Sequence, residues 1–282
     1  MSTTESSAGI EVGLAGTRPP DDRGASVARW FSPAQPPEEA QIRLLLMPHA
    51  GSGAAAYRGW NRLLPAEVGA QALTLPGRQS RRAEPLPVDW DTLLDDLHRA
   101  VLATVDDERP YAMFGHCIGA MLAYRLAVRL EGEGDPPPLL LGMSGWAPKG
   151  FFTAPPGHEK LSMSEFGGMF KDLGAFPEEL WTDPDMLDLV LPPVIADFRI
   201  AVQYEDDGAV VECPLVSYAG GSDPLLVEPG AMKVWTERSH QYLGHHVYPG
   251  GHFYVSDHAA AVMSDFTRRL IRIADGGGGG GA

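Results

Sequence analysis

The stretch Tyr111-Ala-Met-Phe-Gly-His-Cys-Ile-Gly-Ala-Met-Leu-Ala-Tyr124 joins a short apolar run, which ends at Gly115, to a helical pattern. Between them lies Cys117, inside the pentapeptide Gly115-His-Cys-Ile-Gly119. This is the G-x-S-x-G pattern of a nucleophile elbow with sulfur in place of oxygen, and in such an elbow the nucleophile occupies a strained strand-to-helix turn. The residues two positions to either side must be small, and both are glycine here. The pattern therefore favours a nucleophilic Cys117 over an ordinary buried cysteine, although cysteine is common in protein cores.

Strand-like and helix-like segments alternate around this elbow. Short apolar runs predict strands at residues 42–47, 70–75, 111–114, 139–144, 214–219 and 244–248. Apolar residues at helical spacing predict helices at residues 55–64, 89–105, 117–130 and 257–273. Such alternation is typical of βαβ units, which build a mostly parallel sheet with helices on both faces. The predicted fold class is therefore α/β.

The alternation is interrupted between residues 148 and 205, where proline and glycine separate short helix-like pieces at 162–173, 177–180, 184–191 and 194–204. We interpret this segment as a helical lid inserted between strands of the sheet. The predicted division is a disordered leader at 1–27, core at 28–147, lid at 148–205, core again at 206–274 and a flexible glycine tail at 275–282. Leader and tail are assigned in this way because they lack an apolar period.

Composition excludes several classes of protein. The net charge of −15, from 22 Lys and Arg against 37 Asp and Glu, argues against nucleic-acid binding, which needs a basic surface. No apolar run reaches the ~18 residues of a membrane span, and the first residues lack the pattern of a secretory signal. The two cysteines, Cys117 and Cys213, have no metal-ligand spacing. We expect a cytoplasmic monomer without metal or organic cofactor.

A nucleophile needs a base, and the base needs an orienting acid. Downstream of Cys117, two glycine-containing loops follow predicted strands and contain Asp223 and His252. Carboxyl ends of parallel strands are where such sheets place their ligands. Taken alone, Asp223 would be a turn aspartate before proline, and His252 a structural histidine. Together, in the chain order nucleophile, acid, base, they predict a Cys117–His252–Asp223 triad.

A third glycine-rich loop, Pro48-His-Ala-Gly-Ser-Gly53, follows the predicted strand at 42–47. In sheets of this type, a loop after an early strand supplies one of the two backbone amides that bind a developing oxyanion. By itself the loop would be read as a plain glycine turn.

Five segments together resemble type II (editing) thioesterases, the stand-alone enzymes of polyketide and nonribosomal peptide biosynthesis. They are Pro48-His-Ala-Gly51, Leu75-Pro-Gly-Arg78, Gly115-His-Cys-Ile-Gly-Ala120, Gly221-Ser-Asp-Pro224 and Gly251-His-Phe253. The resemblance extends from about Trp30 to Ile273 and includes Leu191-Pro-x4-Asp197-Phe198 in the lid. It implies an α/β-hydrolase fold with a helical lid over an acyl channel.

The resemblance also implies a substrate and roles for residues. The substrate is an acyl group held as a thioester on the phosphopantetheine arm of an acyl or peptidyl carrier protein. Cys117 would be the nucleophile, His252 the base and Asp223 the orienting acid, and the backbone amides of Ala50 and Ile118 would form the oxyanion hole. Because carrier proteins are acidic, the basic cluster Arg78, Arg81 and Arg82 is a candidate docking patch.

The chain departs from the family pattern at two positions. Cys117 stands where the family usually has serine, and Ile195 stands where it often has arginine, two residues before the lid aspartate. An acyl group on sulfur remains a thioester and is a better acyl donor than an oxygen ester, particularly toward amines. Two enzyme hypotheses follow: a thioester hydrolase, which the family favours, and an acyltransferase or cyclase. A non-catalytic carrier-binding protein is the third, and the intact Cys, His and Asp set disfavours it.

Overall fold

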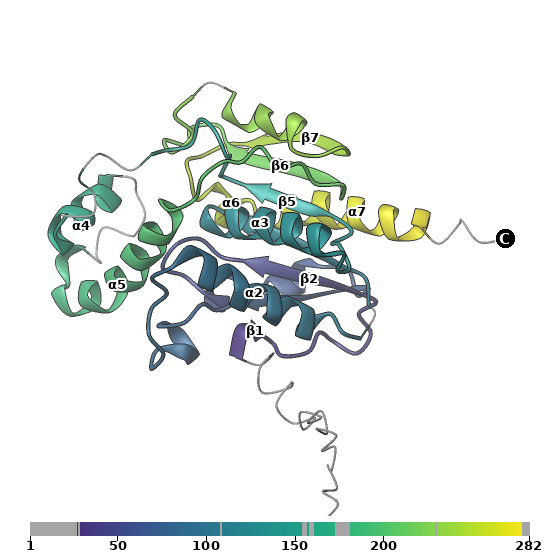
Figure 1. Ribbon diagram of the computed structural model, residues 1–282, viewed down its shortest axis with the longest axis horizontal. Coiled ribbons are helices and arrows are strands. Elements are labelled where there is room, and N and C mark those ends of the chain that lie inside the picture. Colours follow the sequence, from purple (N-terminus) through teal and green to yellow (C-terminus); the bar gives the residue numbers. More distant parts are fainter. Residues whose placement is uncertain are drawn as a thin grey trace, which may run out of the picture.

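The computed structural model describes residues 27, 29–107, 109–153, 157, 161–172, 181–228 and 230–277 (Figure 1). Its centre is one seven-stranded sheet with the order β1-β3-β2-β4-β5-β6-β7. The strands are β1 Phe31–Ser32, β2 Ile42–Met47, β3 Val68–Leu73, β4 Tyr111–His116, β5 Leu141–Ser144, β6 Leu215–Gly220 and β7 Tyr242–Tyr248. Only β1 pairs antiparallel; every other pair is parallel. The predicted mostly parallel sheet is confirmed.

Helices cover both faces of this sheet. On one face lie α2 (Trp90–Thr104) and α3 (Ile118–Glu133), which contribute Leu97, Val101 and Leu122 to the larger apolar core. On the other face lie α6 (Tyr254–Asp257) and α7 (Ala259–Gly277), with Phe266 packed edge-on against Phe114 of β4 at 5.5 Å between ring centroids. Figure 1 shows α2 and α3 in front of the strands. A sheet buried on both faces explains why β2 and β4 are buried along their whole length.

The amino end of α2 is fixed by a local signal. The side chain of Asp89 accepts a hydrogen bond from the backbone amide of Thr92 at 2.7 Å, which satisfies one of the first unpaired amides of the helix. The sequence predicts a helix at 89–105, and in the structure the helix is Trp90–Thr104 with Asp89 as its cap.

The insertion between β5 and β6 contains α4 (Met163–Asp172) and α5 (Pro184–Ala201). A short 3-10 helix, Ala231–Glu237, lies outside this insertion, between β6 and β7. The two expected pieces at 184–191 and 194–204 are one helix, so that prediction is wrong. α5 continues through Pro192 and Pro193, although each proline removes a helical hydrogen bond. Its buried residues Leu191, Val194 and Ile195 pack on Phe166 and Phe170 of α4, and this tertiary contact offsets the local cost. The expected piece at 177–180 lies outside the described residues.

Several boundaries also differ from prediction. Residues 54–63 form two 3-10 helices, Ala54–Tyr57 and Trp60–Leu63, instead of one helix, because Gly59 between them has a left-handed backbone with φ of +85°. The final helical segment is α6 and α7, and α7 continues to Gly277, beyond the expected start of the tail at 275. Of the expected leader, only residue 27 is described. Among the described helices, none combines the length and the apolar character that crossing a bilayer requires.

Candidate active site

Cys117 lies between the end of β4 and the start of α3, in the sterically unfavourable backbone conformation φ 58°, ψ −125°. Non-glycine residues rarely have positive φ, and here the surroundings hold it. A Cβ atom on Gly115 would lie 2.2 Å from the carbonyl oxygen of Gly119, and one on Gly119 would lie 2.1 Å from that of Met47. The amide of Cys117 also donates to the carbonyl of Ser144 on β5 at 2.9 Å. The structure therefore has the geometry that the pentapeptide predicts.

Asp223 and His252 come together beside this elbow. Asp223 follows β6, His252 follows β7, and the Oδ2 atom of Asp223 lies 2.8 Å from the Nδ1 atom of His252. Their two loops are in direct contact, since the amide of Ser222 donates to the carbonyl of Gly250 at 2.9 Å. The second oxygen of Asp223 accepts from the amide of Leu225 at 2.9 Å. The carboxylate is thus bound through both of its oxygens, and it fixes the Nδ1 edge of the imidazole.

The charge on His252 is set by its neighbours. Burial alone would lower its pKa, but the interactions with Cys117 and with the Asp223 carboxylate outweigh burial and raise that pKa to about 10. The Nε2 atom is buried and has no hydrogen-bond partner among the described protein atoms. A protonated His252 beside a thiolate is the ion pair that makes a cysteine nucleophilic.

Two further histidines, to which no sequence pattern gives a role, lie close to His252. The His116 ring lies against the His252 ring at 4.9 Å between centroids, and burial, with the charge of His252, lowers the pKa of His116 well below its usual value. Burial and the same charge lower the pKa of His49 to about 4. His49 and His116 therefore stay neutral beside the protonated His252. Their positions next to the elbow and in the glycine-rich loop were visible in the sequence, but the ring contacts were not.

His116 is held by a buried hydrogen-bond chain. Its Nδ1 atom lies 2.9 Å from the hydroxyl of Ser144, which in turn lies 2.6 Å from that of Tyr254. Gly145, with φ of +61°, leaves room for this arrangement, because a Cβ there would lie 2.8 Å from His116 and 3.3 Å from His252. These hydrogen bonds hold the His116 ring in place, and the His252 ring packs against it.

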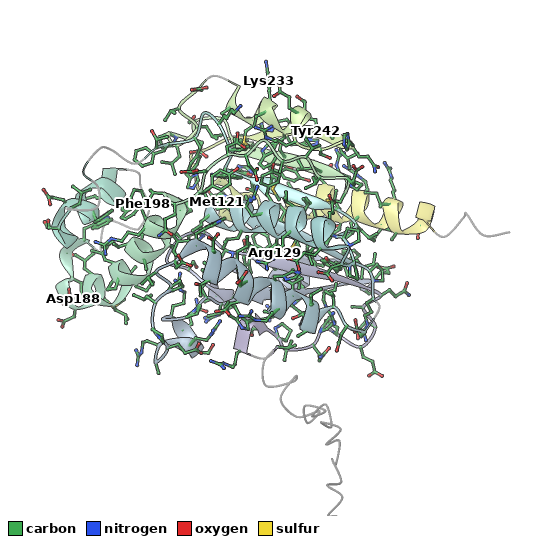
Figure 2. The ribbon with its side chains drawn as sticks, in the orientation of Figure 1. Met121, Arg129, Asp188, Phe198, Lys233 and Tyr242 are labelled. Carbon is green, nitrogen blue, oxygen red and sulfur yellow. The ribbon has the colours of Figure 1, made fainter. Side chains whose placement is uncertain are left out.

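A cavity of about 400 Å³ opens at Cys117. Ala50 and Ile118 line it beside the thiol, and its walls are mainly apolar: Met121 from α3, Phe170 from α4, Phe198 and Ala201 from α5, with Trp146, Phe151 and Phe152 from the segment after β5. Figure 2 shows Met121 and Phe198 where helices α4 and α5 meet the rest of the fold. The amide of Ile118 belongs to the first turn of α3, where amides have no partner within the helix. The cavity suits an apolar chain that ends at the sulfur.

The basic cluster is not a docking patch. Arg78 and Arg81 are only 4% and 5% exposed, and of the three arginines only Arg82 faces solvent. Arg81 pairs with Glu84, with its Nε atom 3.0 Å from the carboxylate, and Arg78 pairs with the lid residue Asp197. The prediction was wrong because spacing along the chain does not show which side chains a lid helix will cover.

One group of described residues could hold a metal ion: His98, Glu133 and Asp135. They lie around the carboxyl end of α3, whereas Cys117 is at its amino end. His98 Nε2 is already 2.8 Å from Asp135.

The parallel sheet, the strained elbow and the paired Asp223 and His252 define the class of protein as an α/β-hydrolase. The sequence profile of the thioesterase domain matches residues 42–270, so the chain belongs to the thioesterase domain family and is a hydrolase that acts on thioesters.

Individual relatives agree with this assignment. The chain is 27% identical to the gramicidin S biosynthesis protein GrsT of Aneurinibacillus migulanus, over 88% of this chain and 96% of that protein. It is 28% identical to the thioesterase PikA5 of Streptomyces venezuelae, over 86% of this chain and 85% of that one. Among solved structures, the type II thioesterase BorB of the borrelidin biosynthetic cluster superposes with a TM-score of 0.75 at 31% identity, covering 86% of this chain and 97% of that one.

Proposed function

We propose that this thioesterase releases acyl groups from the phosphopantetheine arm of an acyl or peptidyl carrier protein in polyketide or nonribosomal peptide biosynthesis. The observation that carries the proposal is the placement of Cys117 at an apolar cavity beside a histidine that a buried carboxylate holds. Its relatives in gramicidin S and borrelidin biosynthesis support the pathway.

In the proposed reaction, the Cys117 thiolate attacks the carbonyl carbon of the thioester and the carbonyl oxygen becomes an oxyanion. The tetrahedral adduct collapses with loss of the pantetheine thiolate, which takes a proton from the His252 imidazolium. Water then attacks the acyl group on Cys117 while the neutral His252 accepts a proton from it. Collapse of this second adduct breaks the bond between carbon and sulfur, releases the free acid and restores the Cys117 thiolate beside protonated His252. Asp223 keeps the Nδ1 atom of His252 turned toward itself, so that Nε2 performs both transfers.

The oxyanion needs two donors near Cys117, and we assign them to the backbone amides of Ala50 and Ile118. Both residues line the cavity at the thiol, and Ile118 brings the positive end of α3 with it. This assignment uses backbone groups only, which fits the glycine-rich loop that supplies Ala50.

Hydrolysis and acyl transfer differ only in the second step, since an amine or an alcohol can replace water. Membership of the thioesterase family favours hydrolysis. The retained thioester on Cys117 makes transfer chemically accessible, so the experiment must include an acceptor. No organic or metal cofactor enters any step.

The test is to incubate the protein with an acylated carrier protein, with and without added amines, and to follow intact mass and product. We expect acyl-Cys117 and free acid in wild type, and a loss of turnover of at least about a thousandfold in Cys117→Ala. Cys213→Ala is the matched control, because that cysteine is buried away from the cavity and should leave turnover intact. Amide in place of free acid would instead support the acyltransferase, and full turnover by Cys117→Ala would refute the triad.

Cys117→Ser separates the chemistry of the sulfur from that of the fold. We expect this variant to stay folded and to shift further toward hydrolysis, because the oxygen ester that it forms is a poorer donor to amines. If Cys117→Ser lost all hydrolysis, this account of the sulfur would be wrong.

A further inference from the structure

We propose that Asp197 and Arg78 form a positioning pair that holds the oxyanion loop, residues 48–53, against the lid helix α5. The pair sets the direction of the Ala50 amide, and neither side chain takes part in the chemistry. The inference rests on the proposed function, because it assigns a role in oxyanion binding to the loop that contains Ala50.

The contacts converge on a single carboxylate. Asp197, on α5, is 1% exposed, and Arg78 is 4% exposed. The guanidinium of Arg78 binds both oxygens of Asp197, with Nη2 2.7 Å from Oδ1 and Nη1 in contact with Oδ2. The amide of Gly51 donates to the same Oδ2 at 2.7 Å. Arg78 Nη1 also donates to the carbonyl of Ser52 at 3.3 Å.

These bonds fix the backbone on the carboxyl side of Ala50. The amide of Gly51 belongs to the peptide plane that begins at Ala50, so its bond to Asp197 sets the orientation of that plane. The Ala50 amide lies in the preceding peptide plane, together with the carbonyl of His49. The amide of Ser52 donates to that carbonyl at 3.1 Å, which closes a turn around Ala50 and Gly51. Within the described part of the chain, no hydrogen bond uses the Ala50 amide, and Ala50 lines the cavity.

Steric fit shows that α5 lies directly on this loop. Gly51 has φ of +74°, and a Cβ atom there would lie 2.1 Å from the Cγ2 atom of Val194 on α5. Only glycine allows this approach together with this backbone conformation. The loop and the lid helix are therefore in contact at two consecutive turns of α5, at Val194 and at Asp197.

Stability alone does not explain such a pair. Burying two charges costs desolvation energy, and an apolar pair of similar volume is often equally stable or more so. The pair instead joins two features that the reaction needs together: a lid that closes the acyl cavity and a loop that presents an amide to the oxyanion. Asp197 lines that cavity beside Ala50, so the two features share one residue.

The test compares Asp197→Asn with a double variant, Arg78→Met with Asp197→Leu. Asp197→Asn keeps the shape but removes the charge that orients Arg78. The double variant removes both charges and should fold well, yet it leaves the Gly51 amide without its acceptor. For both we expect kcat/KM for an acyl N-acetylcysteamine thioester to fall about tenfold to a hundredfold through kcat, with KM little changed.

A second readout distinguishes oxyanion positioning from a general loss of structure. A trifluoromethyl ketone analogue of the acyl group forms a tetrahedral adduct with Cys117 and carries the oxyanion, whereas a methylene ketone analogue stays trigonal. We expect binding of the trifluoromethyl ketone to weaken in parallel with kcat/KM in both variants, and binding of the methylene ketone to remain unchanged.

Asp107→Asn is the matched control. Asp107 binds the buried Arg43 through both oxygens, at 3.1 and 3.2 Å, at the amino end of the same strand whose carboxyl end leads into the oxyanion loop. This variant should lose stability and keep its kinetics. If Asp197→Asn and the double variant keep wild-type kcat/KM, or weaken both ketones equally, the positioning role is refuted. Absence of acyl-Cys117 in wild type would instead refute the proposed function.

Discussion

At the scale of single residues, the site depends on the proton that the His252 ring binds. His252 lies between the Asp223 carboxylate and Cys117, and the two neutral histidines His49 and His116 lie close to it. Because its pKa rises from 6.5 to about 10, folding stabilises the protonated ring. The gain is complete below about pH 6.5 and is lost as pH rises through the folded value near 10.

This proton can be observed directly. In an NMR titration of protein with labelled histidine, we expect the His252 ring to titrate near 10 in wild type and at lower pH in Cys117→Ala, because the thiolate is among the causes of the shift. Unfolding free energy should fall between pH 6.5 and 10 in wild type, and less steeply in His252→Gln. His240→Gln, whose side chain is 62% exposed, is the control and should follow wild type. A His252 ring that titrates near pH 6.5 in wild type would contradict the ion pair.

At the scale of elements, helix α3 decides where the nucleophile lies. Its first turn approaches the end of β2 so closely that Gly119 has no room for a side chain: the nearest atom is the Met47 carbonyl oxygen, 2.1 Å from the position of a Cβ. Its last turn is free of this constraint, since a Cβ on Gly132 would meet nothing within 4 Å. One helix thus contains a glycine that the fold requires and one that it does not.

The two glycines make a matched pair of substitutions. Gly119→Ala should destabilise the protein by about 3 kcal/mol and lower turnover, because α3 must move away from β2 and take Cys117 with it. Gly132→Ala should stabilise the protein by about 0.5 kcal/mol with unchanged turnover, because alanine favours the helix. Urea unfolding with parallel kinetics measures both effects. Equal effects at the two positions would show that the elbow does not depend on this contact.

At the scale of the whole molecule, many arginine side chains form ion pairs with neighbouring carboxylates. Arginines that form ion pairs include Arg29, Arg43, Arg78, Arg81, Arg99, Arg109, Arg125, Arg129, Arg238, Arg268 and Arg269. With a net charge of −15 and without the expected basic patch, the surface repels an acidic partner at long range. Under the proposed function, docking of a carrier protein would then depend on short-range contacts.

Salt should therefore favour the proposed reaction. Raising ionic strength from about 20 mM to about 300 mM should increase kcat/KM for an acyl carrier protein severalfold, because screening weakens the repulsion. The same change should leave kcat/KM for a neutral N-acetylcysteamine thioester unchanged, which makes that substrate the control. A decrease with salt for the carrier substrate would reveal an attractive basic surface and contradict this view.

Local steric and hydrophobic rules explain how much could be predicted from the sequence. A nucleophile elbow needs small residues on both sides of the nucleophile, so the pentapeptide around Cys117 defined the turn, and all-apolar runs predicted the parallel strands. The same local rules predict that a helix ends at Pro192 and Pro193, but α5 continues through both prolines. There the packing of Val194 and Ile195 on α4 outweighs the propensity of the two prolines.

The sequence by itself determined the class of fold, the elbow and the three residues Cys117, Asp223 and His252 as candidates, because each depends on a short pattern at the end of a strand. Only the tertiary structure decided the environment of these residues. Arg78 lies 119 positions from Asp197, and its pairing depends on how the lid helix packs over the oxyanion loop. Burial of that kind is a property of contacts distant in the chain, and it turned an expected docking surface into part of the interior.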